Sequence, residues 1–278
     1  MNDNSIPSVD YRRYRIVRDE GVSLDAMATR PDQAVDKAAG RARFKHNRRR
    51  LQHAQERLYA EGRQALLVVL QAMDTGGKDS AIRKVTARLN PQGCEVTNFT
   101  APNETERRHD FLWRVHRRVP AHGMIGLFNR SHYEDVLIAR VHELAPMATI
   151  ERRYRHINEF ERLLADHGTR IIKIMLHISS DYQLERLRRR LRKPDKHWKF
   201  DPADLAEREY WGEYMRAYEL ALAHCSTEHA PWYVIPAEGR WFRNLLVSEL
   251  LADTVEDMDP RLPPPAFDPD DYPPESLQ

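Results

Sequence analysis

An apolar run that ends in a glycine-lysine turn constrains the fold of this chain more than any other feature. The run from Leu66 to Met73 has the composition of a parallel strand that is covered on both faces. Residues 77–89 have the pattern of a helix, and they overlap the turn Asp74-Thr75-Gly76-Gly77-Lys78-Asp79-Ser80. A strand, a glycine-rich turn and a helix in this order predict a phosphate-binding loop, because backbone N–H groups and the helix N-terminus converge on phosphate oxygens.

The rest of the chain continues this alternation of strands and helices. Further strands are predicted over residues 95–100, 124–128, 170–178 and 232–235. Helices are predicted over residues 103–119, 131–142, 148–167, 181–192, 202–225 and 240–257, with a longer polar helix over 33–61. Strands that alternate with helices form a parallel sheet with helices on both faces. The sequence therefore predicts an α/β fold, with an irregular N-terminal arm and a C-terminal tail as appendages.

Composition and cysteine count favour a globular cytoplasmic protein. Hydrophobic residues make up 41% and charged residues 31% of the chain, which argues against wholesale disorder. The apolar runs are too short to span a bilayer, and the N-terminus lacks the pattern of a signal peptide. The two cysteines, Cys94 and Cys225, support neither a disulfide framework nor a cysteine zinc site.

The charge is distributed unevenly along the chain. The tail from Asp253 onward carries eight acidic residues and one arginine, which leaves 43 basic and 34 acidic residues in 1–252, a surplus of about nine. Arginine supplies 36 of the 44 basic residues, and its planar fork of donors suits phosphate oxygens. Such a body is compatible with a nucleotide, polyphosphate or nucleic acid as ligand. Base composition is an equally good explanation of the arginine usage.

The predicted loop departs from the GxxxxGK[ST] pattern at two positions. Ala72 replaces the first glycine, and Asp79 replaces the hydroxyl residue that binds magnesium. Lys78 stands where a loop lysine bridges two phosphates. Asp74 and Asp79 would repel a phosphate unless a cation lies between them, so the loop itself predicts Mg²⁺. The alternative, a glycine-rich turn without function, leaves the two acids and the lysine unexplained.

A second polar segment follows the strand over 124–128, in Asn129-Arg130-Ser131-His132-Tyr133-Glu134-Asp135. The carboxyl ends of parallel strands meet at one edge of the sheet, so this segment should face the loop. Arg130 could neutralise a transferring phosphoryl group, and Glu134 and Asp135 could hold a metal. An ordinary helix start with an acidic first turn is the alternative.

A third, basic segment lies over residues 186–200 and interrupts the helical pattern at Pro194. Kinases with a phosphate-binding loop use a basic mobile lid at this place to close over phosphates and exclude water. A solvated basic helix face is the alternative. The lid residues that we expect to contact phosphate are Arg186, Arg190, Lys193, Lys196 and Lys199.

Together these segments resemble the polyphosphate kinase 2 family. The resemblance covers roughly residues 35–255 and rests on the loop and on four further stretches: Phe111 to His116, Phe128 to Leu137, Arg153 to Ile157, and Ala230 to Ala237, with the lid-like Trp198-Lys199-Phe200. It implies a three-layer α/β/α fold of the P-loop kinase type, with a five-stranded parallel sheet and a helical lid. The implied division is an arm and polar helix over 1–62, a phosphotransferase domain over 63–258 with its lid over about 186–200, and an acidic, proline-rich tail over 259–278.

The resemblance also implies an activity. Members of the family move phosphoryl groups between inorganic polyphosphate and nucleotides, and the class III branch, which this chain is most similar to, phosphorylates nucleoside mono- and diphosphates. The implied acceptors are adenine nucleotides, with guanine nucleotides as an alternative. The expected assembly is a homo-oligomer without nucleic-acid or membrane partners. Two rival functions remain open: an ATP-dependent nucleoside monophosphate kinase and a non-catalytic module that binds polyanions.

The site residues carried over from the resemblance fall into three groups. Asp74, Lys78, Arg130 and Glu134 are the expected catalytic residues, and Asp74 and Glu134 the expected ligands of Mg²⁺. Phosphate binding is assigned to Thr75, Gly76, Gly77, Lys78, Asp79 and Ser80. Many family members have an aspartate where this chain has Asn129, which is a poorer metal ligand, so the metal role passes to Glu134 and the roles of Asn129 and Asp135 stay open.

Overall fold

The centre of the molecule is a five-stranded, wholly parallel sheet. The structure, a computed structural model, describes residues 9–17 and 21–276, so parts of the predicted N-terminal arm lie outside it. The strands run in the order β2-β3-β1-β4-β5, and β1 is covered on both faces over its whole length. Their bounds are β1 Ala65–Gln71, β2 Cys94–Asn98, β3 Ile125–Asn129, β4 Thr169–His177 and β5 Trp232–Pro236. This confirms the predicted parallel α/β sheet.

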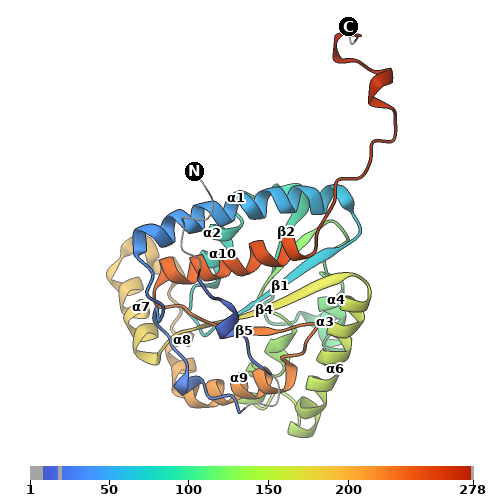
Figure 1. The fold of residues 1–278 in the computed structure, drawn as a ribbon. Helices are drawn as coiled ribbons and strands as arrows, with labels where there is room; N and C mark the ends of the chain where they lie inside the picture. The colour runs from blue at the N-terminus through green and yellow to red at the C-terminus, as the bar shows by residue number, and fades with distance from the viewer. Residues whose placement is uncertain (1–8, 18–20, 277–278) are drawn as a thin grey trace.

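Helices cover both faces of the sheet (Figure 1). One layer contains α1 Lys37–Glu61, α2 Lys78–Val85 and α10 Arg240–Asp257. The opposite layer contains α5 Ile138–Val141, α6 Met147–Asp166 and α9 Trp211–Cys225. The remaining helices are α3 Glu104–Arg107, α4 Trp113–His116, α7 Ser180–Arg192 and α8 Ala203–Glu207, and the last two are joined by a 3₁₀ helix, η6 Pro194–Lys199. The predicted three layers and the helical segment over the lid are thus present.

Three predicted helices are wrong in their extent. Residues 103–119 form two short helices, because the Asp110 carboxylate caps a new start by accepting from the backbone N–H groups of Leu112 and Trp113. Residues 131–142 form a 3₁₀ turn, η5 His132–Asp135, and then α5. Residues 202–225 pass through α8, a 3₁₀ turn and α9 rather than one helix. Local polar capping by Asp110, which periodicity does not report, divides the first of these segments.

The polar helix α1 and the N-terminal arm belong to the folded body. Helix α1 lies along α10, and Arg43 and Arg50 form ion pairs with Glu249, while Leu51 is fully buried. In the arm, the Ile16 N–H donates to the Trp232 carbonyl beside β5 (2.9 Å). The prediction that the arm is an appendage is therefore wrong, because its apolar residues complete the core at Val9, Tyr11, Tyr14, Ile16 and Leu24.

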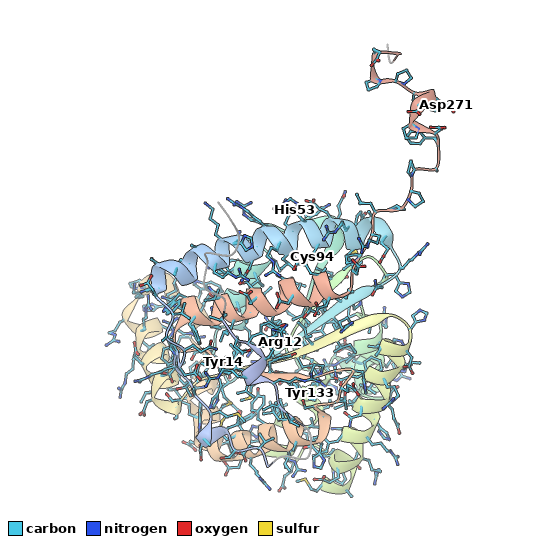
Figure 2. All side chains as sticks on the ribbon, viewed as in Figure 1. Arg12, Tyr14, His53, Cys94, Tyr133 and Asp271 are labelled. Atoms are coloured by element: carbon cyan, nitrogen blue, oxygen red, sulfur yellow. The ribbon has the colours of Figure 1, made fainter. Side chains whose placement is uncertain are left out.

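The C-terminal tail leaves this body after α10. Figures 1 and 2 show it extending away from the helices, with Asp271 near its far end. Its side chains are exposed from Arg261 to Glu275. Cys94 and Cys225 form no disulfide bond. Within the part of the chain that the structure describes, no helix is long and apolar enough to cross a membrane.

Candidate active site

The loop between β1 and α2 has the backbone geometry of an anion-binding turn. Thr75 and Gly77 both have positive φ angles, 66° and 96°. A side chain at Gly76 would meet the Ala72 side chain at 2.7 Å, so this glycine is required by close packing. The buried Thr75 hydroxyl oxygen has no hydrogen-bond partner among the described residues. The loop thus places a polar group without a partner among the described residues just before the N-terminus of α2.

Lys78 is the first residue of α2 and is 8% exposed. Its ammonium group donates to the Ala72 carbonyl oxygen (2.8 Å), which holds it across the loop. Burial lowers the pKa of Lys78, the Asp74 carboxylate raises it, and the nearby Arg130 charge lowers it. Any anion bound here would favour the charged form of this lysine.

Arg130 and Asn129 connect the end of β3 to the loop. Arg130 has a left-handed backbone (φ 62°), and its guanidinium donates to an Asp74 carboxylate oxygen at 2.9 Å. The Asn129 amide donates to carboxylate oxygen Oδ1 of Asp79 (2.9 Å) and to the Asn98 side-chain oxygen (2.7 Å). Sequence reasoning left Asn129 without a role, and the structure shows that it orients Asp79.

Glu134 lies on the 3₁₀ turn η5, beside Asp74 and Arg130. The three residues line a small side cavity of about 150 Å³, with Tyr214 and Tyr218 opposite. Burial raises the pKa of Glu134 above its usual range, while the charges of Arg130 and Lys78 oppose that rise. A cation bound between Asp74 and Glu134 would stabilise the ionised carboxylate. Asp135, in contrast, forms an ion pair with Arg153 (3.6 Å) and holds α6.

A fully buried ion pair supports this turn from beneath. The Lys173 ammonium on β4 is paired with the Glu161 carboxylate on α6, and both side chains are 0% exposed. Lys173 also donates to the Tyr133 hydroxyl (2.7 Å), which donates to Glu161 (2.9 Å). The His132 ring lies 3.2 Å from the same carboxylate. Figure 2 labels Tyr133 in the interior, one residue from Glu134.

The main cavity opens over the loop and has a volume of about 580 Å³. It brings together the predicted residues Asp74, Thr75, Gly77, Lys78, Asp79, Ser80, Arg130, Arg186, Arg190, Lys196 and Lys199. Gly76 and Lys193 are not part of its lining, and Glu134 reaches only the side cavity. Sequence reasoning missed two arginines that also line it, Arg83 and Arg240, and it placed Arg189 in the basic segment without expecting a contact.

The basic segment over the cavity is anchored at two points. Arg190 donates to Asp204 and to the Lys199 carbonyl oxygen, both at 2.8 Å, so it ties η6 to α8. The Gln183 side chain of α7 donates to the Asp74 carbonyl oxygen (3.1 Å). Trp198, at the outer end, is 77% exposed. The segment therefore contacts the loop through its base while its tip faces solvent.

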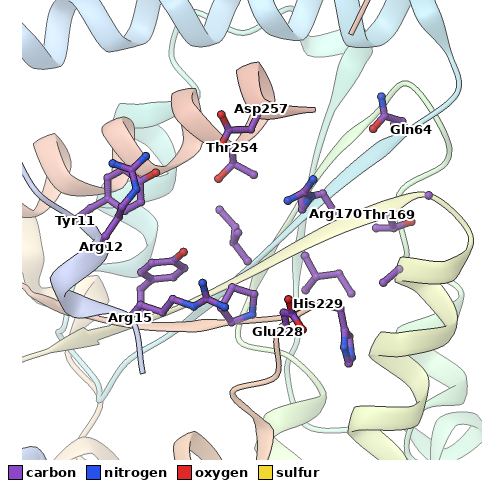
Figure 3. A pocket seen from close by; sticks show the side chains of 16 residues that line it. Tyr11, Arg12, Arg15, Gln64, Thr169, Arg170, Glu228, His229, Thr254 and Asp257 are labelled. Carbon is purple, nitrogen blue, oxygen red and sulfur yellow. The ribbon is translucent and has the colours of Figure 1, made fainter. Parts of the chain in front are cut away.

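A second large cavity lies away from the loop, where the N-terminal arm meets β4 and β5. It has a volume of about 520 Å³, and Arg12, Arg15 and Arg170 line it together with Glu228 and Asp257 (Figure 3). Its mixed charge contrasts with the cationic lining of the main cavity. Among the residues that the structure describes, the main cavity joins the loop, the basic segment and the carboxylates of Asp74 and Asp79.

Comparison with known proteins agrees with this geometry. Residues 34–263 match the family model described as Polyphosphate kinase 2. The chain belongs to the polyphosphate kinase 2 family. An AMP/ADP-polyphosphate phosphotransferase of Meiothermus ruber is 54% identical over 217 residues, which are 78% of this chain and 81% of the relative. An ADP-polyphosphate phosphotransferase of Rhodopseudomonas palustris is 42% identical over 89% of this chain and 90% of its own.

The solved structures place this polyphosphate kinase 2 chain in the same fold. The crystal structure of polyphosphate kinase 2 from Arthrobacter aurescens TC1 superposes with a TM-score of 0.90 at 44% identity, covering 94% of this chain and 95% of that one. The family, the enzyme class and the P-loop kinase fold expected from the sequence are thereby confirmed. Both rival functions, a monophosphate kinase driven by ATP and a module without catalysis, lose their support.

Proposed function

We propose that this chain transfers the terminal phosphoryl group of inorganic polyphosphate to AMP and ADP. One observation carries the proposal: a cationic cavity of about 580 Å³ lies over the loop, with the carboxylates of Asp74 and Asp79 at its floor. A polyanion fits the lining, and the acids mark the place of a cation between phosphates. The Meiothermus ruber relative, named for both AMP and ADP, supports both acceptors.

The residues divide the work of transfer as follows. The lid side chains Arg186, Lys196 and Lys199 hold the polyphosphate. Lys78 and Arg130 offset the charge on the phosphoryl group in flight, and the buried position of Lys78 strengthens its effect. A nucleotide phosphate has a second pKa of about 6 and is mostly ionised at neutral pH, so no general base is required. Positioning and charge stabilisation supply most of the rate.

Magnesium fits the donor set at this site. Among the described residues, no group of three or more histidines, cysteines or acids is placed to hold a metal. Asp74 and Glu134 line the same side cavity, and Mg²⁺ is commonly bound by one or two carboxylates together with waters and substrate phosphates. When bound, the ion would neutralise charge on the donor and acceptor phosphates. Asn129 keeps Asp79 in place but contributes no charge.

Nucleotide chromatography without ATP tests the proposal. The enzyme is incubated with long-chain polyphosphate, Mg²⁺ and either ADP or AMP. ADP should yield ATP, and AMP should yield ADP and then ATP. An inert AMP with consumption of ADP would restrict the acceptors to diphosphates, and no product from either would overturn the function. Parallel runs with GDP and GMP measure the base preference.

Two further properties complete the proposal. We infer a homo-oligomer in the cytoplasm that acts on free nucleotides rather than on nucleic acid or a membrane. Light scattering of the full-length protein measures the mass of the assembly, and a monomer at micromolar concentration would contradict it.

A further inference from the structure

A buried arginine lies directly behind the phosphate-binding loop. Arg243 belongs to the first turn of α10, which starts just past the carboxyl end of β5, and its exposed fraction is 1%. It does not line the main cavity. The sequence motifs of the family resemblance do not include it, and none of the roles described above uses it.

The guanidinium group is held against the loop. Its Nη2 atom donates to the Ser80 hydroxyl (3.3 Å) and to the Asn244 side-chain oxygen (2.8 Å). Its Nη1 atom occupies the space behind Gly77, where an added Cβ would lie only 2.2 Å away. Gly77 has a left-handed backbone (φ 96°), so both the conformation and the neighbouring arginine require a glycine here.

The charge of Arg243 has no acidic partner in the described part of the chain. Its hydrogen-bond acceptors there, Ser80 and Asn244, are neutral. The charged groups that interact with it electrostatically include Arg240 and Arg186. Burial, reinforced by these two arginines, lowers the pKa of Arg243 to about 10, which still leaves it protonated at neutral pH. A buried cation without a counter-charge is costly, and proteins rarely retain one without a use.

We propose that Arg243 is a positioning residue whose counter-charge is the polyphosphate bound on the other side of the loop. Its guanidinium group fixes Gly77 and Ser80 at the start of α2. Its positive charge adds to the electrostatic potential at the loop, from behind the loop backbone. Lys78 acts from within the cavity, and Arg243 acts through the loop backbone. The inference rests on the proposed function, because it takes polyphosphate to be the anion.

Substitution of Arg243 by methionine tests the proposal. Methionine keeps an unbranched stem and removes the charge and the fork. We expect KM for polyphosphate to rise at least about tenfold, while KM for ADP stays within about twofold. The gain in Tm that tripolyphosphate produces should fall, and Tm without tripolyphosphate should be unchanged or higher, because an uncompensated buried charge has been removed. Arg243→Lys, which keeps the charge, should recover part of the Tm gain.

Arg50 provides the matched control. It is a partly buried arginine with carboxylate partners, Asp253 and Glu256, and it lies on α1 away from the cavity. Arg50→Met should lower Tm without changing KM for polyphosphate. If Arg243→Met behaves in the same way, with wild-type KM and an undiminished Tm gain, Arg243 is only structural and the proposal is overturned.

Two further outcomes are distinguishable. If the wild-type enzyme shows neither turnover with polyphosphate nor a Tm gain, the proposed function fails before the role of Arg243 is addressed. If Arg243→Met does not fold, Arg243→Gln takes its place, since glutamine retains polar contact with Ser80 and Asn244 without the charge. The same two readouts, KM for polyphosphate and the Tm gain, then support or overturn the proposal.

Discussion

At the residue scale, the site depends on two cations that the protein holds in place, the buried Lys78 and the partly exposed Arg130. Lys78 and Arg130 are held by oxygens of the protein, the Ala72 carbonyl and the Asp74 carboxylate. Each contact holds a cationic side chain at the place where a phosphoryl group would bind. Little reorganisation of these side chains is therefore needed during transfer. Asn129 does the same for Asp79. One ion pair and two polar contacts therefore set the geometry of the site.

Replacement of Lys78 by alanine should lower kcat at least about a hundredfold, the usual order for the loss of one preorganised electrostatic contact. Turnover of polyphosphate with ADP measures it. Lys84→Ala, on the exposed side of the same helix, is the matched control and should leave kcat unchanged within about twofold. Near-normal turnover by a folded Lys78→Ala enzyme would contradict the assignment of the loop.

Glu134→Gln should raise the Mg²⁺ concentration needed for half-maximal rate and lower kcat, because the metal keeps only one protein carboxylate. Asn129→Ala should shift the Mg²⁺ dependence much less, since Asn129 contacts Asp79 and carries no charge. Titration of Mg²⁺ against rate for both variants decides between them. The opposite order of effects would move the metal role from Glu134.

At the element scale, the lid is a basic segment with a fixed base and an exposed tip. The ion pair of Arg190 with Asp204 joins the lid to α8, so Arg190 is a structural anchor as well as part of the cavity lining. Lys196 and Lys199 lie on η6 and line the cavity, whereas Lys193 stands just before that helix and does not. The lid thus contains two lysines that are expected to contact polyphosphate, Lys196 and Lys199, and a third, Lys193, that serves as their control.

The double variant Lys196→Gln/Lys199→Gln should weaken the apparent affinity for polyphosphate and flatten its dependence on salt. Each lost phosphate contact reduces the slope of log affinity against log salt concentration by about one, by analogy with nucleic acids. Lys193→Gln should leave that slope unchanged. A series of KM values at increasing NaCl measures it, and equal slopes for the double variant and the wild type would show that these lysines face only solvent.

At the scale of the whole molecule, the core and the site share one buried network. Lys173 on β4 and Glu161 on α6 pair beneath Tyr133, so the same contacts that join the sheet to a helix layer also place the turn that carries Glu134. Removal of one partner leaves a buried charge without compensation. Stability and active-site geometry should therefore be lost together.

Lys173→Met should reduce the free energy of unfolding by about 3–5 kcal/mol, the range for breaking a buried ion pair. The double variant Lys173→Met/Glu161→Leu should recover much of that loss. Arg155→Met, which breaks an exposed pair with Glu159 on α6, should change stability by less than about 1 kcal/mol. Urea denaturation measures the free energy of unfolding of the three variants. Equal losses of stability in Lys173→Met and Arg155→Met would show that the buried pair contributes no more than the exposed one.

The sequence by itself determined the strands, their parallel pairing and the loop. An apolar run such as Leu66 to Leu70 can be buried only inside a two-sided sheet, and the glycine-lysine turn after it follows from local backbone geometry. The family motifs then indicated Arg130 and Glu134 correctly as neighbours of Asp74. These features depend on short stretches of chain, which a linear pattern records.

Only the tertiary structure decided which distant residues meet. Arg243 lies 166 positions beyond Gly77 in the numbering and occupies the space that a Cβ there would need, and Glu161 reaches Tyr133 from another helix. The break at Asp110 also follows from polar contacts that periodicity cannot carry. The neighbours of a buried charge are set by tertiary packing and not by spacing along the chain. For that physical reason the sequence did not reveal the position of Arg243.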